Sequence, residues 1–287
     1  MTRIDRKLFA ALLAAAAACG AAFPSFAQGA SAPKRIASIN LCTDQQLLAL
    51  AAPSQIAALS PYAHDQLRSW LAERAARYPT LSGYAEDALV LSPDLVVAGS
   101  FTRRQTRDLL RAQGVRVEEF DVANSIEETK QQMTRFGALV GREDEAARQN
   151  AAIDAAVARA RAAASRRPTR VLPIQRRGWV SGRKSLMTSL LETVGLRNAA
   201  AGAGVDFGRL MSLEAIVMMQ PDLLLVSRAD NVAEDQGSAM LLHPAIAARY
   251  PRDRLIVLPE SLTVCGGPML VEALDRLAEQ IALLPSH

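Results

Sequence analysis

The chain has few of the side chains that catalysis and metal binding use most. It contains three histidines and three cysteines among 287 residues. No Gly-x-Ser-x-Gly nucleophile motif, His-Glu-x-x-His zinc motif or glycine-rich phosphate-binding loop is present. A Cys–His catalytic pair would need Cys42 or Cys265 with His64 or His243, and His243 before Pro244 is better explained as a helix-start residue. These absences argue against an enzyme, and against a protein that binds a bare metal ion through several histidines and carboxylates.

Long apolar runs are absent after the first residues. Basic residues at the start precede an unbroken apolar stretch at Leu8–Ala18, which is too short to span a bilayer. Small residues up to Ala27 suit a signal peptidase, which predicts a signal peptide at residues 1–27. In the alternative, Cys19 is a lipidated N-terminus, although the residue three positions before it is not the leucine that a lipobox prefers. Both readings predict an exported protein, and cleavage after Ala27 would leave it periplasmic and soluble.

The charge balance excludes one class of partner. The formal net charge is +4 at pH 7, and the basic residues are dispersed along the chain. No concentrated basic surface is therefore expected, and the sequence predicts no nucleic-acid partner.

Signal cleavage leaves two cysteines, Cys42 and Cys265. In an oxidising compartment a pair of cysteines is more often bridged than free. The residues leave three readings open: a disulfide, a contact to ligand or metal, and two inert thiols. Two cysteines do not make a disulfide scaffold, so hydrophobic burial must form the core.

A short phrase occurs twice in the chain. Glu86-Asp-Ala-Leu-Val-Leu-Ser-Pro93-Asp-Leu-Val-Val97 returns as Glu214-Ala-Ile-Val-Met-Met-Gln-Pro221-Asp-Leu-Leu-Leu-Val226. Each copy predicts a short helix, a proline turn and a buried strand. The copies are too far apart for a solenoid, whose repeat is about 20–50 residues long. They predict two similar α/β lobes that face each other across a cleft.

Strands and helices alternate along most of the chain. The predicted strands are Arg35–Asn40, Gln55–Leu59, Leu95–Ala98, Val115–Phe120, Arg170–Ile174 and Leu255–Leu258. The predicted helices are Gln45–Ala51 (capped by Thr43 or Asp44), Asp65–Arg77, Thr102–Gln113 (closed by Gly114), Leu186–Val194, a segment near Leu241–Tyr250, and Leu270–Leu283. This alternation predicts three-layer α/β lobes with mostly parallel sheets.

The middle of the chain is different. Ser125–Glu128 is a capping box that starts a helix, and Glu143–Arg166 is rich in alanine without glycine or proline, which favours one long helix. We expect this helix to join the lobes, although it could belong wholly to one of them. The predicted organisation is an N-terminal lobe at 28–124, a linking segment at 125–167 and a C-terminal lobe at 168–287.

Several of these features together resemble a known family. They are the Arg-Ile-Ala-Ser start of the first strand, the doubled Glu-x6-Pro-Asp-Leu, the capped long helix and Ser181-Gly-Arg-Lys-Ser185. The chain from about Arg35 to Leu283 resembles the periplasmic vitamin B12- and ferric-siderophore-binding proteins. That family has two lobes joined by a stiff helix, holds its ligand between them, and serves ATP-driven (ABC) importers without catalysis.

The resemblance implies two kinds of site residue. One glutamate on each lobe would dock into arginines of the membrane permease, and these match Glu86 and Glu214. An alternative is that each glutamate only favours a helix N-terminus. The ligand would lie among loops at the carboxyl ends of the strands, where arginines could bind oxygen anions and aromatic rings could stack. The candidate cleft residues are Tyr62, Tyr84, Phe101, Arg103, Arg104, Arg176, Arg177, Trp179 and Arg228.

The abundance of arginine in these loops favours a bulky anionic ligand, a ferric siderophore. A corrinoid such as vitamin B12 carries less negative charge and would need fewer arginines. Haem is a third choice, suggested by Tyr84 after Gly83, where related haem carriers place a ligating tyrosine. The hypothesis is a monomeric solute-binding protein with no permanent cofactor. It captures a metal chelate and delivers it to the permease of an ABC importer. Cys42 and Cys265 fall in loops on opposite sides of the expected cleft.

Overall fold

The computed structural model describes residues 32–164, 169–227 and 243–283. They belong to one compact unit that begins at Ala32. The predicted signal peptide at 1–27, the alternative lipidation site Cys19 and the candidate cleft residue Arg228 lie outside the described residues.

The first sheet is parallel and has four strands. They are β1 (Ile36–Ser38), β2 (Ile56–Ala58), β3 (Leu95–Gly99) and β4 (Val117–Phe120), in the order β2-β1-β3-β4. β1 lies against both β2 and β3, with Ile36 opposite Ile56 on one side and Leu95 on the other.

Helices cover both faces of this sheet, whose central strands β1 and β3 are fully buried. On one face the strands pack against α1 (Leu41–Leu50) and α5 (Ile126–Val140). On the other they pack against α3 (Ala85–Val90) and α4 (Arg104–Ala112). Smaller elements are the 3-10 helix η1 (Pro53–Gln55) and the one-turn helix α2 (Ala72–Ala75).

The second sheet repeats this plan. Its strands are β5 (Arg170–Pro173), β7 (Arg197–Asn198), β9 (Leu223–Val226) and β10 (Leu255–Val257), all parallel. The order β10-β9-β5-β7 is that of the first sheet read from the other edge, with β5, β7, β9 and β10 in the places of β1, β2, β3 and β4. The two sheets therefore have one topology, as the doubled phrase predicted.

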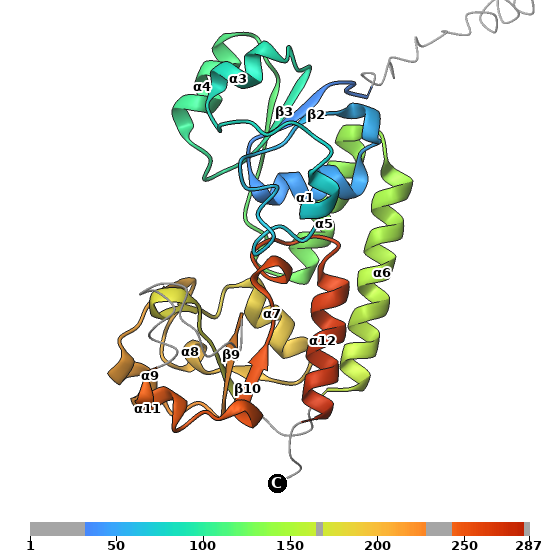
Figure 1. The fold of residues 1–287 in the computed structure, drawn as a ribbon. Coiled ribbons are helices and arrows are strands. Elements are labelled where there is room, and N and C mark those ends of the chain that lie inside the picture. The colour runs from blue at the N-terminus through green and yellow to red at the C-terminus, as the bar shows by residue number, and fades with distance from the viewer. Residues whose placement is uncertain (1–31, 165–168, 228–242, 284–287) are drawn as a thin grey trace, which may run out of the picture. The chain divides into compact units, whose positions relative to one another are not determined.

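The second sheet is also the middle of three layers (Figure 1). α7 (Leu186–Thr193) and α12 (Leu270–Ala282) cover one face, and α8 (Ala199–Gly202), α9 (Leu213–Met219) and α11 (Pro244–Ala247) cover the other. The short helices η2 (Arg176–Gly178), η4 (Arg252–Arg254) and η5 (Glu260–Leu262) lie in loops. β6 (Trp179–Ser181) and β8 (Gly208–Leu210) form a separate antiparallel pair.

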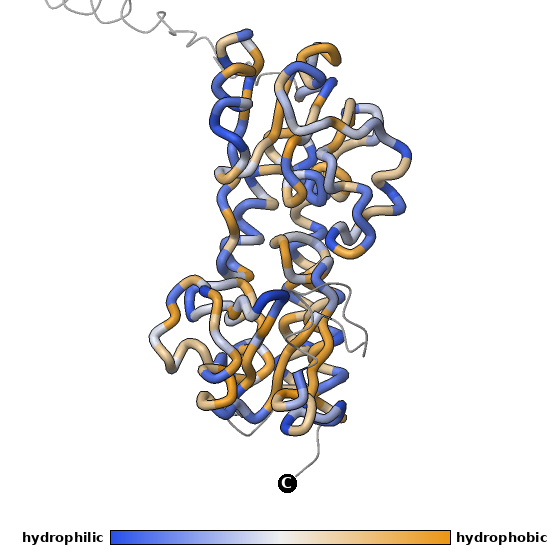
Figure 2. Tube along the Cα trace, turned by 60° about the vertical axis from the view of Figure 1, so that its left-hand side comes forward, coloured by the Kyte–Doolittle hydropathy of each residue, from blue (hydrophilic) through white to orange (hydrophobic). Residues whose placement is uncertain are grey.

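One hydrophobic core joins the two lobes. α6 (Glu143–Ala162) packs against α5 and α12, and Figure 1 shows it alongside both lobes. The same cluster of buried side chains runs from Ile36 in β1 through Phe136 in α5 and Ile153 in α6 to Leu225 in β9. Hydrophobic segments accordingly follow the strands of both sheets (Figure 2). Burial of this shared surface holds the lobes together.

The doubled phrase has a local structural role in both lobes. Asp94 accepts hydrogen bonds from the backbone of Arg35 just before β1, and Asp222 accepts one from the backbone of Arg170 at the start of β5. In return, the Arg35 guanidinium donates to Leu91 O after α3, and that of Arg170 donates to carbonyls at the end of α9. We call this pair of contacts the Arg–Asp clasp. It ties the first strand of each lobe to the end of a helix, whose last carbonyl groups have no partner within the helix.

Two local predictions were wrong. The segment expected to be a helix at Asp65–Arg77 has α-helix only at α2, because Leu67 is exposed and does not form part of an apolar face. The cap of α1 is Asn40, whose side chain accepts from the backbone N–H groups of Cys42 and Thr43. The predicted closure of α4 at Gly114 is confirmed, and this glycine adopts φ of 80°.

A disulfide and a hydrogen bond add to the connection between the lobes. Cys42 in α1 is bonded to Cys265, which lies just before α12, and their Cα atoms are 5.2 Å apart. The indole of Trp70 donates to the Glu272 carboxylate in α12 at 2.8 Å. Both contacts join residues of the first lobe to the end of the chain that packs on the second.

Asp44 fastens α1 to the end of β2. Its carboxylate is fully buried and accepts hydrogen bonds from Ser60 N at 3.0 Å and Ser60 Oγ at 2.5 Å. Burial raises the pKa of Asp44 from 3.8 to about 7, although the hydrogen bonds with Ser38 and Ser60 act in the opposite direction.

This carboxylate makes stability depend on pH. Between about pH 4 and 7 the folded protein keeps a proton on Asp44 that the unfolded chain has released, so the free energy of unfolding falls as pH rises through that window. Asp44→Asn removes this titration. Relative to that variant, the wild type should lose up to about 4 kcal/mol between pH 4 and pH 8 in urea unfolding. Asp253→Asn, at an exposed position, is the control, and a constant difference between wild type and Asp44→Asn would contradict the assignment.

Loss of the disulfide should weaken the fold without changing its topology. The bond closes a loop of 223 residues, and removing it frees the unfolded chain. Cys42→Ala/Cys265→Ala is expected to lower the free energy of unfolding by about 2–5 kcal/mol in urea. A reducing agent should destabilise the wild type to the same extent and leave the double variant unchanged. Equal stability of the oxidised and reduced wild type would show that the bond does not support the fold.

Candidate functional site

The site lies where the strand order reverses in both sheets. In the first lobe the chain leaves β1 for β2 on one side and later returns to β3 on the other. The carboxyl ends of two such strands diverge into loops and leave a crevice between them. Asn40 follows β1 and Ser100 follows β3, and both line a cavity of about 370 Å³ together with residues of the second lobe.

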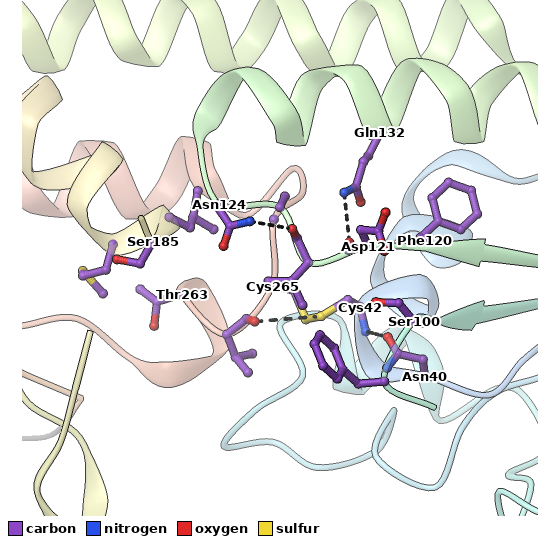
Figure 3. A pocket seen from close by; sticks show the side chains of 18 of the residues that line it. Asn40, Cys42, Ser100, Phe120, Asp121, Asn124, Gln132, Ser185, Thr263 and Cys265 are labelled. Atoms are coloured by element: carbon purple, nitrogen blue, oxygen red, sulfur yellow. Dashed lines mark hydrogen bonds between the residues drawn. A yellow bond between two sulfur atoms is a disulfide. The ribbon is translucent and has the colours of Figure 1, made fainter. Parts of the chain in front are cut away.

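The disulfide forms part of the wall of this cavity. Figure 3 shows Cys42 and Cys265 between Asn40 and Ser100 on one side and Thr263 and Ser185 on the other. Because the bond crosses from one lobe to the other beside the ligand space, it limits how far the two walls can move apart.

Aromatic rings line the cavity from both lobes. Phe101, in the loop after β3, is 86% exposed, and Phe120 at the end of β4 is buried. Trp179 of β6 and Phe207 before β8 belong to the second lobe and are 42% and 66% exposed. Large rings left open to a cavity provide flat apolar surfaces for a ligand.

Uncharged polar groups fill the space between the rings. Five lining residues are amides: Asn40, Gln46, Asn124, Gln132 and Gln175. Several hydroxyls accompany them: Thr43, Ser100, Ser181, Ser185 and Thr263. The Gln46 side chain is buried, and its Oε1 accepts no hydrogen bond from the described residues. Together the amides and hydroxyls give the wall both donors and acceptors for a ligand.

Formal charge is scarce on the wall. Among the described lining residues, Asp121 and Lys184 are the charged ones. Lys184 Nζ lies 3.2 Å from the Asp206 carboxylate, which Arg183 also contacts at 2.6 Å. Hydrogen bonds from Arg183 and then Lys184 hold the pKa of Asp206 below its usual value. Two cations share one carboxylate here, which leaves a positive excess at the cavity edge.

Two of the predicted cleft arginines have local partners instead. Arg103 lies over the ring of Tyr84, 4.8 Å from its centroid, and a hydrogen bond with Tyr84 raises the pKa of this guanidinium. Arg104 in α4 bonds Asp108 one turn further on, at 3.3 Å. None of Arg103, Arg104 and Tyr84 lines the cavity.

The remaining candidates divide in the same way. Tyr62 is half-exposed outside the cavity with Arg68 over its ring, and Arg176 and Arg177 lie in the tight turn η2, where Arg177 has φ of 60°. Of the residues proposed from the sequence, Phe101, Trp179, Cys42 and Cys265 line the cavity. Arg228 belongs to a segment outside the described residues.

Sequence reasoning did not identify several lining residues. Lys184 was noted only as part of the Ser181–Ser185 motif, and Phe207 lies in a stretch for which no element was predicted. The β6–β8 pair, which these two residues flank, was not predicted. The amides of α1 and α5 were assigned to helices and not to the site. The one available signal was that Gln46 stands among apolar residues on the inner face of α1.

The two glutamates occupy the same position in their helices. Glu86 is the second residue of α3 and Glu214 the second residue of α9. Both are exposed, and neither lies at the cavity. The side chain of Glu86 has no hydrogen bond or ion pair with the described residues. The carboxylate of Glu214 interacts with its own backbone N–H and with Ser212, which lowers its pKa.

None of the helices among the described residues combines the length and the apolar character that crossing a membrane requires. No three side chains of His, Cys, Asp or Glu among those residues come together as a metal-binding group.

Comparison with known proteins agrees with this architecture. A family model described as periplasmic binding protein matches residues 36–248. A curated relative, the cobalamin-binding protein of Halobacterium salinarum (strain ATCC 29341 / DSM 671 / R1), is 24% identical over 261 residues, 86% of this chain and 69% of the relative.

Solved structures show the same fold. The periplasmic heme-binding protein RhuT from Roseiflexus sp. RS-1 in apo form is 27% identical with a TM-score of 0.71, over 87% of this chain and 98% of that chain. A periplasmic heme binding protein from Pseudomonas aeruginosa is 24% identical with a TM-score of 0.71, over 88% and 94%. The family model covers most of the chain, and the resemblance to vitamin B12- and ferric-siderophore-binding proteins is confirmed: this chain belongs to the periplasmic binding protein family.

Proposed function

We propose that this chain captures a corrinoid of the cobalamin type in its cleft and delivers it to the permease of an ABC importer. The observation that carries the proposal is the composition of the cavity wall, in which rings and amides predominate and charge is scarce. A corrin is a flat macrocycle whose edge bears several amide side chains, and its net charge is small. Rings can stack on its faces, and the amides of the protein can pair with those of the ligand.

The criterion is the number of cations at the cavity wall. In the sequence it favoured a ferric siderophore, and in the structure it favours the corrinoid. An anionic chelate needs several cations at the wall, and Arg103 and Arg104 contact partners outside the cavity. The name of the Halobacterium relative, a cobalamin-binding protein, agrees with this choice.

Haem is the second candidate, since the Roseiflexus structure is that of a heme-binding protein. A haem carrier needs a side chain that can bind iron. The described lining residues include neither histidine nor tyrosine, and the Met187 side chain is buried. Haem therefore ranks below the corrinoid and enters the binding test as a competitor.

Trp179 should report ligand binding. The chain has two tryptophans, and the second, Trp70, is held by Glu272 away from the cavity. Cyanocobalamin should quench the intrinsic fluorescence of the wild type and of Trp70→Phe. Trp179→Phe should lose most of this quenching and about tenfold in affinity, measured independently by calorimetry.

The ligands are compared in the same assay with haem and with ferric siderophores. Preferential binding of a ferric siderophore would contradict the corrinoid assignment, and so would preferential binding of haem. Quenching that depends on Trp70 instead would contradict the location of the site.

We infer that Glu86 and Glu214 dock the loaded protein onto the permease. The family serves as the substrate-binding part of ABC importers, and the resemblance assigns one docking glutamate to each lobe. In both helices an exposed apolar side chain follows four residues after the glutamate, on the same helix face: Val90 is 82% exposed and Met218 is 81% exposed. A carboxylate beside an exposed apolar group, present at matching places, suits a basic partner with apolar pockets in its two halves.

Docking and binding should separate by mutation. Glu86→Ala/Glu214→Ala is expected to lower ATP-driven uptake of cyanocobalamin at least tenfold while its affinity in solution stays unchanged, because the carboxylates lie outside the cavity. Glu73→Ala/Glu279→Ala removes the same charge from two other exposed positions and should leave uptake intact. Loss of ligand affinity in the first double variant would contradict the docking role.

A further inference from the structure

The β6–β8 pair breaks the symmetry between the lobes. The two four-stranded sheets correspond strand for strand, but the first lobe, as far as the structure describes it, contains no antiparallel pair. Trp179 lies opposite Leu210 and Ser181 opposite Gly208. The pair is joined to the end of β5 by an antiparallel bridge between Ile174 and Val180. An element present in one lobe only is a candidate for the part that selects the ligand.

Gly208 determines how the Trp179 ring lies. A Cβ atom at position 208 would stand 2.7 Å from Trp179 Cζ2 and 3.0 Å from Cε2, closer than side chains approach one another. The indole therefore lies directly against the bare backbone of the neighbouring strand, as a diagonal cross-strand partner. Trp179 is still 42% exposed and lines the cavity.

A cation is held beside this ring system. Phe207 directly precedes Gly208, and Lys184 Nζ lies 5.4 Å from the centroid of its ring. Asp206 contacts Lys184 and Arg183 together, so the carboxylate orients the ammonium group without cancelling the charge of both cations. Both Phe207 and Lys184 line the cavity.

We propose that the β6–β8 pair and the residues beside it select the ligand through two separate contacts. The Trp179 indole, positioned by Gly208, takes the flat face of the corrin, and Lys184 takes the one anionic group of cobalamin, its phosphodiester. Gly208 is a positioning residue, since it acts through Trp179. The proposal rests on the corrinoid function for its ligand, but the position of the indole can be tested without any ligand.

The first test places a methyl group under the indole. In a Trp70→Phe background, Gly208→Ala should shift the emission of Trp179, increase its quenching by acrylamide and weaken cyanocobalamin binding about tenfold. Gly202→Ala is the matched control, since a Cβ atom there meets nothing within 4 Å. Unchanged emission and affinity in Gly208→Ala would overturn the positioning role.

A double-mutant cycle guards against a merely structural effect. With Trp179→Ala already present, Gly208→Ala should cost no further affinity, because no ring remains to be displaced. An equal loss with and without the indole would mean that Gly208 acts on the fold and not on Trp179, and would overturn the proposal. If Gly208→Ala yields too little folded protein, the Lys184 variants described below still test the contact with the phosphodiester.

The second test uses two corrinoids. Dicyanocobinamide keeps the corrin ring but lacks the phosphodiester and the nucleotide base. Lys184→Met should weaken cyanocobalamin about tenfold and leave dicyanocobinamide unchanged, while Lys184→Arg should keep most of the preference. Lys34→Met, which removes the same charge at an exposed position away from the cavity, should leave both affinities unchanged.

The outcomes separate the two levels of the argument. An equal loss for both corrinoids in Lys184→Met, or no loss for either, would overturn the role of Lys184. If the wild type binds neither corrinoid, the proposed function fails. The emission of Trp179 in Gly208→Ala then still reports whether Gly208 positions the indole.

Discussion

Burial of one continuous hydrophobic core is the constraint on which the rest of this molecule depends. The inner faces of both sheets, represented by Val97 in β3 and Leu225 in β9, pack into the same cluster through α5, α6, α7 and α12. The lobes thus share their largest apolar cluster, while a smaller cluster lies on the other face of each sheet. A cleft formed on such a base has walls whose separation is set by packing, and the Cys42–Cys265 bond reinforces that separation at the cavity itself. Ligand selection can then rely on side chains already in place, which lowers the entropy cost of binding.

The residues of the doubled phrase have a structural role and, in our proposal, a functional one. Its aspartate belongs to the Arg–Asp clasp, which fixes the helix end and the strand start in each lobe. Its glutamate has no part in that clasp. In the first lobe Glu86 makes no bond to the described residues, whereas Glu214 interacts with its own helix start. The repetition of the phrase is therefore explained for Asp94 and Asp222 by local structure, and docking to a partner is our account of the two glutamates.

The sequence was most informative where a pattern depends on local chemistry. Buried strands such as Leu95–Gly99, the stop at Gly114 and the two-lobe plan follow from apolar periodicity, turn residues and repetition. It was least informative about where long side chains end. Arg103 and Arg104 follow β3 as expected. However, Arg103 lies over the Tyr84 ring and Arg104 pairs with Asp108, and neither lines the cavity.

Other elements of the site depend on contacts between residues distant in the chain. The stretch that contains Trp179 reads as a loop, because its strand partner at Gly208–Leu210 lies in a segment without strong periodicity. Gln46 reads as a polar interruption in a helix, and only the folded structure shows that it lines the cavity. The expected helix at Asp65–Arg77 failed for a related reason: its apolar residues do not all meet a common surface, and Leu67 points to solvent.

The matching strand orders of the two sheets have a consequence for how such a chain could arise. If one lobe was copied to give the other, the single ancestor carried the inner sheet face that now lies in the shared cluster. Exposed to water, that face would have driven two ancestral copies together. The present two-lobed chain would then be a fused pair, and the unmatched β6–β8 strands a later addition that made its two halves unequal.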